Sequence, residues 1–126
     1  MRLNQQGVLT IYNYKQEHNI QSLIMIELSK LGYIPLRANA GQFWQGQQAT
    51  IDGQRILTNI KAVKGMPEGT SDIICIMPNG RTAWIECKTA TGKQREAQVR
   101  FQQMVESLGH KYYIMRCVED IKQLAE

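Results

Sequence analysis

The sequence of 126 residues predicts one α/β domain built around a mixed β-sheet. Patterns of helical period occur near both ends, and short strand-like runs lie between them. No repeat, low-complexity tract or Pro/Ser-rich linker divides the chain. A chain of this length buries one hydrophobic core and is too short for two. We therefore expect residues 1–126 to form a single domain.

The composition excludes several classes of protein. Hydrophobic residues make up 43% and charged residues 21%, which is typical of a globular chain and not of a disordered one. The longest apolar run, residues 73–77, is far shorter than the ~20 residues of a membrane helix, and the first residues do not resemble a signal peptide. The three cysteines fit neither a disulfide framework nor a four-thiolate zinc site. We expect a cytoplasmic protein without a membrane partner.

The first third of the chain predicts an arm, a helix and a strand. Residues 1–16 have weak periodicity, so we expect an arm with at most one short strand. Apolar residues recur at helical spacing from Glu17 to Leu31, and Gly32 follows where a helix commonly ends. Tyr33–Arg37 then reads as a short strand.

Residues 42–63 predict a hairpin insertion. The alternation of residue types there is centred on Asp52-Gly53, a favoured pair for a two-residue hairpin turn. The glycines and the proline of Gly65–Ser71 predict a loop after it.

The second half of the chain predicts three strands and two helices. We expect strands at Asp72–Met77 and Thr82–Lys88, a helix at Lys93–Leu108, a strand at Lys111–Val118 and a short helix at Glu119–Ala125. Strands joined by a hairpin are antiparallel, whereas the long helix makes a crossover, so the sheet is mixed.

The segment from Asp72 to Lys88 carries the most informative charges. If its turn is centred on Asn79, Asp72 lies directly opposite Glu86. Opposed carboxylates repel, so a positive group should lie between them. Lys88 is one candidate, because strand alternation places it on the same face as Glu86. A divalent metal ion is the other.

The chemistry of these residues fits a hard metal ion. Mg²⁺ takes oxygen ligands and keeps several waters, so two carboxylates and a phosphate oxygen suffice. Such an ion polarises a phosphodiester, and a neighbouring lysine can offset the charge that develops on phosphorus. His18 and His110 lack the spacing of a zinc site. The alternative is that Glu86-Cys87-Lys88 is only a solvated strand face.

Two motifs together resemble a known family. Gly65-x-x-x-Gly69-x-x-Asp72 followed by Glu86-Cys87-Lys88 resembles the pattern of the PD-(D/E)xK nuclease superfamily, and is most similar to its virus-type replication-repair branch, the VRR-NUC domain. Further positions match the family pattern: Glu17, Gln21, Arg37, Asn39, Gly41 and Gln98. One position departs from it, because Ser71 stands where a proline usually precedes the aspartate.

The resemblance implies a restriction-endonuclease-like core of order α-β-β-β-α-β, with helices flanking a mixed central sheet. It also implies an endodeoxyribonuclease that depends on Mg²⁺ or Mn²⁺. Asp72, Glu86 and the backbone carbonyl of Cys87 would be the metal ligands. Lys88 would position or activate the attacking water.

The resemblance assigns further roles to Glu17 and Gln98. Glu17 would approach the metal from the first helix. Glu27 competes with it, because both lie at the edge of the same apolar stripe, and an edge salt bridge is the alternative for Glu27. Gln98 would lie in the active site, the alternative being a solvated helix surface.

Basic residues outnumber acids around the predicted hairpin and at the start of the later helix. Such clusters suit the phosphate backbone of DNA, although a solubilising surface is the alternative. We predict nucleic-acid contacts at Arg37, Asn39, Lys61, Lys64, Lys93 and Arg95. Phe43 and Trp44 could stack on unpaired bases, cover the core or form a subunit interface.

The resemblance to stand-alone members of the family implies a structure-selective endonuclease acting on branched DNA such as Holliday junctions. A phage or prophage source would suit that family. One small chain has one active site, so cutting both strands implies a homodimer, with residues 42–63 at its interface or arching over the DNA. The alternatives are a non-catalytic nucleic-acid-binding or assembly protein and an RNA-directed nuclease.

Overall fold

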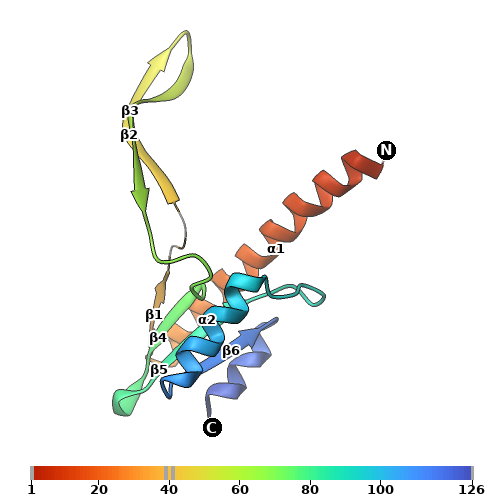
Figure 1. The fold of residues 1–126 in the computed structure, drawn as a ribbon, viewed down its shortest axis with the longest axis vertical. Coiled ribbons are helices and arrows are strands. Elements are labelled where there is room, and N and C mark those ends of the chain that lie inside the picture. Colours follow the sequence, from red (N-terminus) through yellow and green to blue (C-terminus); the bar gives the residue numbers. More distant parts are fainter. Residues whose placement is uncertain (1, 39, 41, 126) are drawn as a thin grey trace.

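A computed structural model describes the backbone of residues 2–38, 40 and 42–125, and the side chains of residues 16–38, 40 and 44–125. Its elements, drawn in Figure 1, follow in the order α1 (Arg2–Lys30), β1 (Ile34–Arg37), β2 (Gln42–Ile51), β3 (Gln54–Lys64), β4 (Ile73–Ile76), η1 (Pro78–Gly80), β5 (Thr82–Cys87), α2 (Glu96–Ser107), β6 (Lys111–Met115) and η2 (Val118–Ala125). The order confirms the predicted α/β class. Within the described part of the chain, none of the helices has the sustained apolar stretch that crossing a bilayer requires.

Four strands form the central sheet in the order β1-β4-β5-β6. β1, β4 and β5 are antiparallel neighbours, whereas β5 and β6 are parallel and joined through α2. The mixed sheet is therefore as predicted. In the β4–β5 hairpin Ile73 pairs with Ile85, which is the register that the turn at Asn79 predicts.

The hydrophobic core lies on one face of this sheet. Ile73 and Ile85 from the central strands pack there with Ile24 and Leu28 of α1 and with Leu124 of η2, and all five are buried. Each such side chain contributes about 1.5–3 kcal/mol when it is removed from water. Ile24 and Leu28 are one helical turn apart, which is why their spacing predicted this helix.

The other face of the sheet is covered by α2. Phe101 of this helix packs edge-on against Trp84 of β5, with ring centroids 5.7 Å apart, and lies 6.4 Å from the ring of Tyr112 on β6. The β1–β4 side of the same face remains open, and Ile34, Leu36 and Ile76 are exposed there. The sheet is thus fully covered on one face and half covered on the other.

Three predicted boundaries differ from the structure by more than one residue. The arm expected at residues 1–16 is helical from Arg2 onward, so the short strand allowed there was wrong. Figure 1 shows this half of α1 projecting beyond the sheet, where no core imposes an apolar stripe on the helix. α2 begins at Glu96 and not at Lys93, and β6 ends at Met115 and not at Val118.

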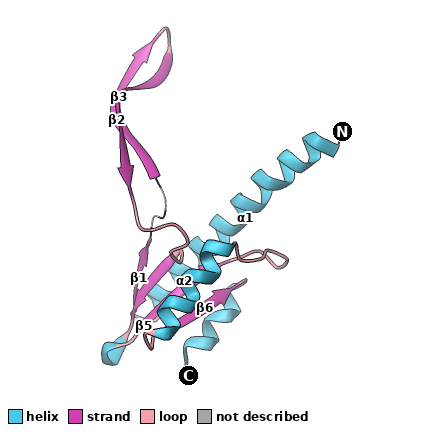
Figure 2. Ribbon diagram, in the orientation of Figure 1, coloured by secondary structure: helices cyan, strands magenta, loops and turns pink. Residues whose placement is uncertain are grey.

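The predicted hairpin insertion is confirmed as a separate two-stranded ribbon. β2 and β3 pair with each other, and Figure 2 shows them projecting away from the four-stranded sheet. Asp52 and Gly53 form the turn with φ of 52° and 79°, the positive values that a two-residue hairpin turn of this kind requires.

Candidate active site

A pocket of about 590 Å³ lies where β5 ends and gathers most of the predicted site residues. Six of its lining residues are those predicted for catalysis or metal binding: Glu17, Asp72, Glu86, Cys87, Lys88 and Gln98. Three further lining residues were predicted to contact nucleic acid: Arg37, Lys93 and Arg95. These residues come from α1, β1, the start of β4, the end of β5 and the start of α2. The fold therefore assembles one site from segments far apart in the sequence.

Asp72 and Glu86 form the acidic part of the pocket. Asp72 immediately precedes β4, and its Oδ2 accepts a hydrogen bond of 2.7 Å from the backbone N–H of Cys87. Glu86 is only 1% exposed, and its Oε2 has no hydrogen-bond partner among the described residues. Burial, together with the hydrogen bond and the negative charge of Asp72, raises the pKa of Glu86 to about 9. A buried, incompletely satisfied carboxyl group is costly, which makes this position a candidate functional site.

Lys88 supplies a buried positive charge next to these acids. The residue is 6% exposed, and its Nζ lies 3.6 Å from Oε1 of Glu17. Its charge also lowers the pKa of Glu86 against the larger upward effect of burial. Lys88 and a divalent metal ion were the two positive groups considered between the opposed carboxylates. The structure places Lys88 in the pocket next to them.

The two rival glutamates of α1 lie in different surroundings. Glu17 lines the pocket and pairs with Lys88. Glu27 instead forms an ion pair of 3.0 Å with Lys30, one turn later on the same helix, and both side chains are solvent-accessible. The salt bridge considered for Glu27 is present, and Glu17 is the α1 glutamate that lines the pocket.

Gln98 belongs to the pocket wall and also caps a helix. Its side chain is 5% exposed, so the solvated surface considered as its alternative is wrong. Oε1 of Gln98 accepts a hydrogen bond of 2.7 Å from the backbone N–H of Arg95, the residue that precedes α2. Helix capping explains this oxygen, so a contact with a ligand could come only from the amide NH₂ group.

Gly69 lets the loop before Asp72 lie directly against α2. A Cβ atom at this position would collide with the carbonyl oxygen of Ala97, and φ of Gly69 is 87°. Both features exclude a larger residue. The glycine that suggested a family motif therefore has a packing reason in this chain.

The donor groups fit a hard divalent metal ion. Among the described residues, no three acidic, histidine or cysteine side chains converge closely enough to form a complete metal cage. Mg²⁺ does not need one, since one or two carboxylates and several waters suffice. Such a donor set is formed by the carboxyl group of Asp72 and by Oε2 of Glu86, which has no hydrogen-bond partner among the described residues. Burial raises the pKa of the Cys87 thiol, so this residue would offer its backbone carbonyl and not a thiolate.

The predicted nucleic-acid contacts fall into two groups. Arg37, Lys93 and Arg95 border the pocket. Lys61 and Lys64 lie on β3 and are exposed, away from the residues that line it. Asn39 and the side chain of Phe43 lie outside the described residues, whereas Trp44 is 65% exposed and covers no core. Trp44 remains available for stacking or for an interface.

Two residues of the site carry no signal in the sequence. His18 lines the pocket, and its Nδ1 lies 3.5 Å from Nη1 of Arg37. Arg116, just after β6, donates from Nη1 to the carbonyl oxygens of Thr89 (2.6 Å) and Gly92 (2.7 Å). Arg116 thereby fixes the loop that follows Lys88. Neither contact is local in the sequence, so only the fold reveals it.

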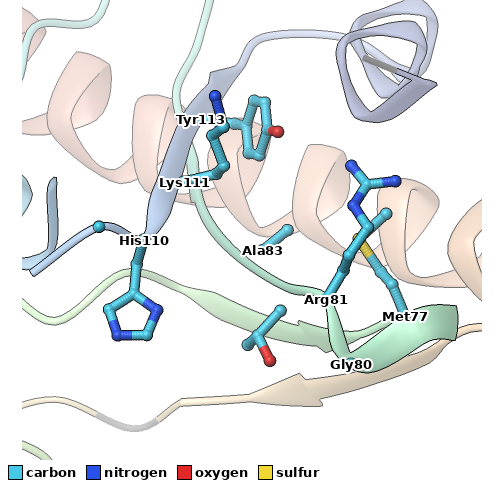
Figure 3. Close-up of a pocket in the computed structure, with 9 residues that line it drawn as sticks. Met77, Gly80, Arg81, Ala83, His110, Lys111 and Tyr113 are labelled. Atoms are coloured by element: carbon cyan, nitrogen blue, oxygen red, sulfur yellow. The ribbon is translucent and has the colours of Figure 1, made fainter.

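A second cavity of about 270 Å³ contains none of the predicted site residues. It lies at the opposite ends of β5 and β6. Figure 3 shows His110 and Lys111 on one side of it and Arg81 with Met77 on the other. Nη2 of Arg81 donates a hydrogen bond of 2.9 Å to the carbonyl oxygen of Leu124, so this residue helps to attach η2.

Comparison with known proteins supports the fold. No family model matches this sequence, and no curated protein matches it. A solved structure described as a VRR_NUC domain is similar to this chain with a TM-score of 0.58, covering 87% of this chain and 94% of that one. The two sequences are 15% identical, so the likeness shows the fold alone. The predicted resemblance to the VRR-NUC domain and its restriction-endonuclease-like fold is thereby confirmed.

Proposed function

We propose that this protein is a metal-dependent nuclease that hydrolyses phosphodiester bonds in DNA. The observation that carries the proposal is the buried carboxyl group of Glu86, next to the half-buried carboxyl group of Asp72 and the buried ammonium group of Lys88. Burying apolar side chains at this position would cost less free energy than burying ionisable ones. The presence of ionisable side chains here therefore indicates a functional role. The fold shared with a VRR_NUC domain agrees with that reason.

Asp72, Glu86 and the carbonyl oxygen of Cys87 would hold Mg²⁺ or Mn²⁺. The ion, when bound, polarises the scissile phosphodiester and makes a bound water more acidic. The hydrogen bond from the Cys87 N–H keeps Asp72 in place before any ligand arrives. This preorganisation of Asp72 lowers the entropic cost of assembling the acidic groups around a ligand.

Lys88 would orient the attacking water and offset the negative charge that grows on the phosphate. Its burial and its ion pair with Glu17 restrict the ammonium group to the pocket. A positive charge held in position stabilises the negative charge of the transition state more than a mobile, hydrated charge does. Glu17 acts as the group that positions Lys88. Gln98 completes the wall with its amide NH₂ group.

DNA is the substrate that the surrounding charges favour. Arg37, Lys93 and Arg95 border the pocket and can bind the phosphates on either side of the scissile bond. These contacts carry no sequence information, so we propose selection by DNA structure, with branched DNA such as a Holliday junction as the leading substrate. A non-catalytic binding protein and an RNA-directed nuclease are the alternatives.

A homodimer would give this site the symmetry of a four-way junction. Such a junction offers two equivalent strands related by a two-fold axis, which two copies of one site can match. The uncovered apolar residues Ile34, Leu36 and Ile76, on and beside the edge strand β1, offer a surface for a second copy. Sedimentation at micromolar concentration is expected to give twice 14.4 kDa. A monomer that still cuts junctions in symmetric pairs would overturn the dimer.

The test of the function is cleavage of four labelled substrates of matched sequence: a four-way junction, a flap, a linear duplex and an RNA duplex. We expect junction cleavage with Mg²⁺ or Mn²⁺ and none with EDTA. Faster cleavage of RNA would select the RNA-directed alternative. Tight binding to junctions without cleavage in any metal would select the non-catalytic one.

A further inference from the structure

The β2–β3 ribbon is rooted in the wall of the pocket. The chain enters the ribbon just after Arg37 and Ala38, and leaves it just before Gly69 and Thr70, and all four residues line the pocket. A single β-bridge between Ala40 and Met66 joins the two segments that connect the ribbon to the rest of the protein. A nucleic acid whose phosphate reaches the pocket must therefore pass the root of this projecting hairpin (Figure 1).

Both faces of the ribbon carry cations and amides interspersed with exposed apolar side chains, which are Trp44, Ile51, Ile56, Leu57, Ile60 and Val63. Trp44 pairs with Ala62 on the face that also carries Lys64, while Val63 lies on the face of Lys61. A ribbon that covered a core or a protein partner would instead separate an apolar face from a polar one. The described ribbon side chains include an amide series: Gln45, Gln47, Gln48, Gln54 and Asn59. Amides and cations together suit a nucleic acid, because cations bind phosphates and amides can pair with base edges.

A bulge in the middle of the ribbon gives it a built-in bend. The register shifts between Gln45 and Gln47, where Gly46 lies opposite the extra residues of β3. A Cβ atom on Gly46 would lie 2.8 Å from the carbonyl oxygen of Thr58, so only glycine fits. Asn59 adopts φ of 53° there, and its Nδ2 donates to Oε1 of Gln47 at 3.2 Å. Bulges increase the local twist and turn a strand, which lets a ribbon follow a curved surface.

We propose that the β2–β3 ribbon is a second DNA-binding element, which lies in the major groove of the duplex arm next to the scissile bond. This inference rests on the proposed function. β3 has 11 residues, which span about 35 Å, or roughly one turn of B-DNA. The major groove admits a two-stranded ribbon. Arg55, Lys61 and Lys64 bind phosphates along the arm, while Gln47 and Gln54, which share one face of the ribbon, face the base edges. The ribbon thus makes affinity depend on the length of that arm.

The test compares two junctions that differ only in arm length, about 20 or about 6 base pairs, by fluorescence anisotropy without divalent metal. The ribbon variant is the triple substitution Arg55→Gln, Lys61→Gln and Lys64→Gln. Its matched control, Lys30→Gln, Lys111→Gln and Lys122→Gln, removes three exposed charges from other elements. We expect the ribbon variant to lose about tenfold in affinity for the long arm and its salt slope to fall by about 2 to 3. The control should stay within about twofold.

A second variant tests the groove itself. Deleting residues 48–50 and 55–57 removes three facing pairs and keeps both the bulge and the Asp52–Gly53 turn. We expect loss of hydroxyl-radical protection about one helical turn from the scissile bond. Unchanged affinity for the long arm in both variants, or equal loss on both arm lengths, would overturn the proposal. So would a deletion that splits a dimer in sedimentation while DNA affinity holds, because the ribbon would then be a subunit interface.

Failure of the proposed function would be distinguishable from failure of the ribbon proposal. Wild-type protein with Mg²⁺ and the short-arm junction reports on cleavage without the ribbon contacts. No cleavage there, with length-dependent binding intact, would reject the nuclease and retain the ribbon as a DNA-binding element. Cleavage with length-independent binding would do the reverse.

Discussion

The molecule contains two antiparallel hairpins with opposite surroundings. β4–β5 lies inside the four-stranded sheet, and Ile85 of this hairpin is 0% exposed. β2–β3 pairs only within itself in the described sheets, and Ile56 there is 37% exposed. Both hairpins turn through a residue of positive φ, Asn79 in one and Asp52 in the other. Their local structures are alike, whereas their neighbours are not.

This difference decides the chemistry that each hairpin can perform. Glu86 is surrounded by protein, so its carboxyl group is held back from ionising and keeps an unused acceptor. Lys61 and Lys64 are exposed to water, where a positive charge suits long-range attraction of phosphates. We therefore assign the buried groups to the proposed reaction and the exposed cations to the proposed binding surface.

The largest effect is expected when either of the two paired acids of the pocket, Asp72 or Glu86, is neutralised. Asp72→Asn or Glu86→Gln should reduce metal-dependent cleavage on the order of a thousandfold, because each would remove a metal ligand. Circular dichroism should remain that of the wild type. The matched control is Glu27→Gln, which removes a carboxylate from the exposed pair with Lys30 and should leave the rate unchanged. Wild-type cleavage by either acid variant would reject the metal site.

Removal of the buried cation should separate turnover from binding. Lys88→Ala is expected to lower the rate about a hundredfold while DNA affinity at fixed salt stays nearly unchanged, because Lys88 is assigned to the transition state. Lys30→Ala, an exposed lysine on α1, serves as the control. If affinity falls as much as the rate, Lys88 is a phosphate anchor and not a catalytic group.

A matched pair of isoleucines measures the packing of the two hairpins. Ile85→Ala should lower the free energy of unfolding by about 2–5 kcal/mol, because it leaves a cavity in the core. Ile56→Ala on the ribbon should cost no more than about 0.5–1 kcal/mol. Urea unfolding monitored by circular dichroism gives both values. A large loss from Ile56→Ala in a monomeric sample would mean that the ribbon packs against the body of the protein.

The smallest predicted effect is a pH dependence of stability in EDTA. Folding raises the pKa of Glu86 from the ordinary glutamate pKa of 4.5 to about 9. Between these two pH values the folded protein keeps a proton on Glu86 that the unfolded chain has lost. Stability from this group is therefore present at low pH and is lost as the pH rises toward 9. At pH 8 the Glu86→Gln variant should melt roughly 3–6 °C above the wild type, and at pH 5 the two should coincide. Equal melting temperatures at pH 8 would contradict the burial effect.

The elements of the central sheet were predictable because local patterns encode them. The spacing of Ile24 and Leu28 predicted the packed half of α1, and the turn at Asn79 predicted the register that pairs Ile73 with Ile85. The N-terminal half of α1 was missed because its sequence lacks such a pattern. Amphipathic periodicity arises from a core, and this half of the helix extends past the core.

The sequence by itself determined the order of the elements, the two hairpin turns and the opposition of Asp72 and Glu86, since these depend on periodicity, turn residues and strand register. The tertiary structure decided that Glu17 lines the pocket while Glu27 does not, buried Gln98 at a helix cap, and brought Arg116 to the loop after Lys88. It also left the ribbon outside the core. Such outcomes depend on which surfaces meet when distant segments pack, and a pattern along one segment does not contain that information.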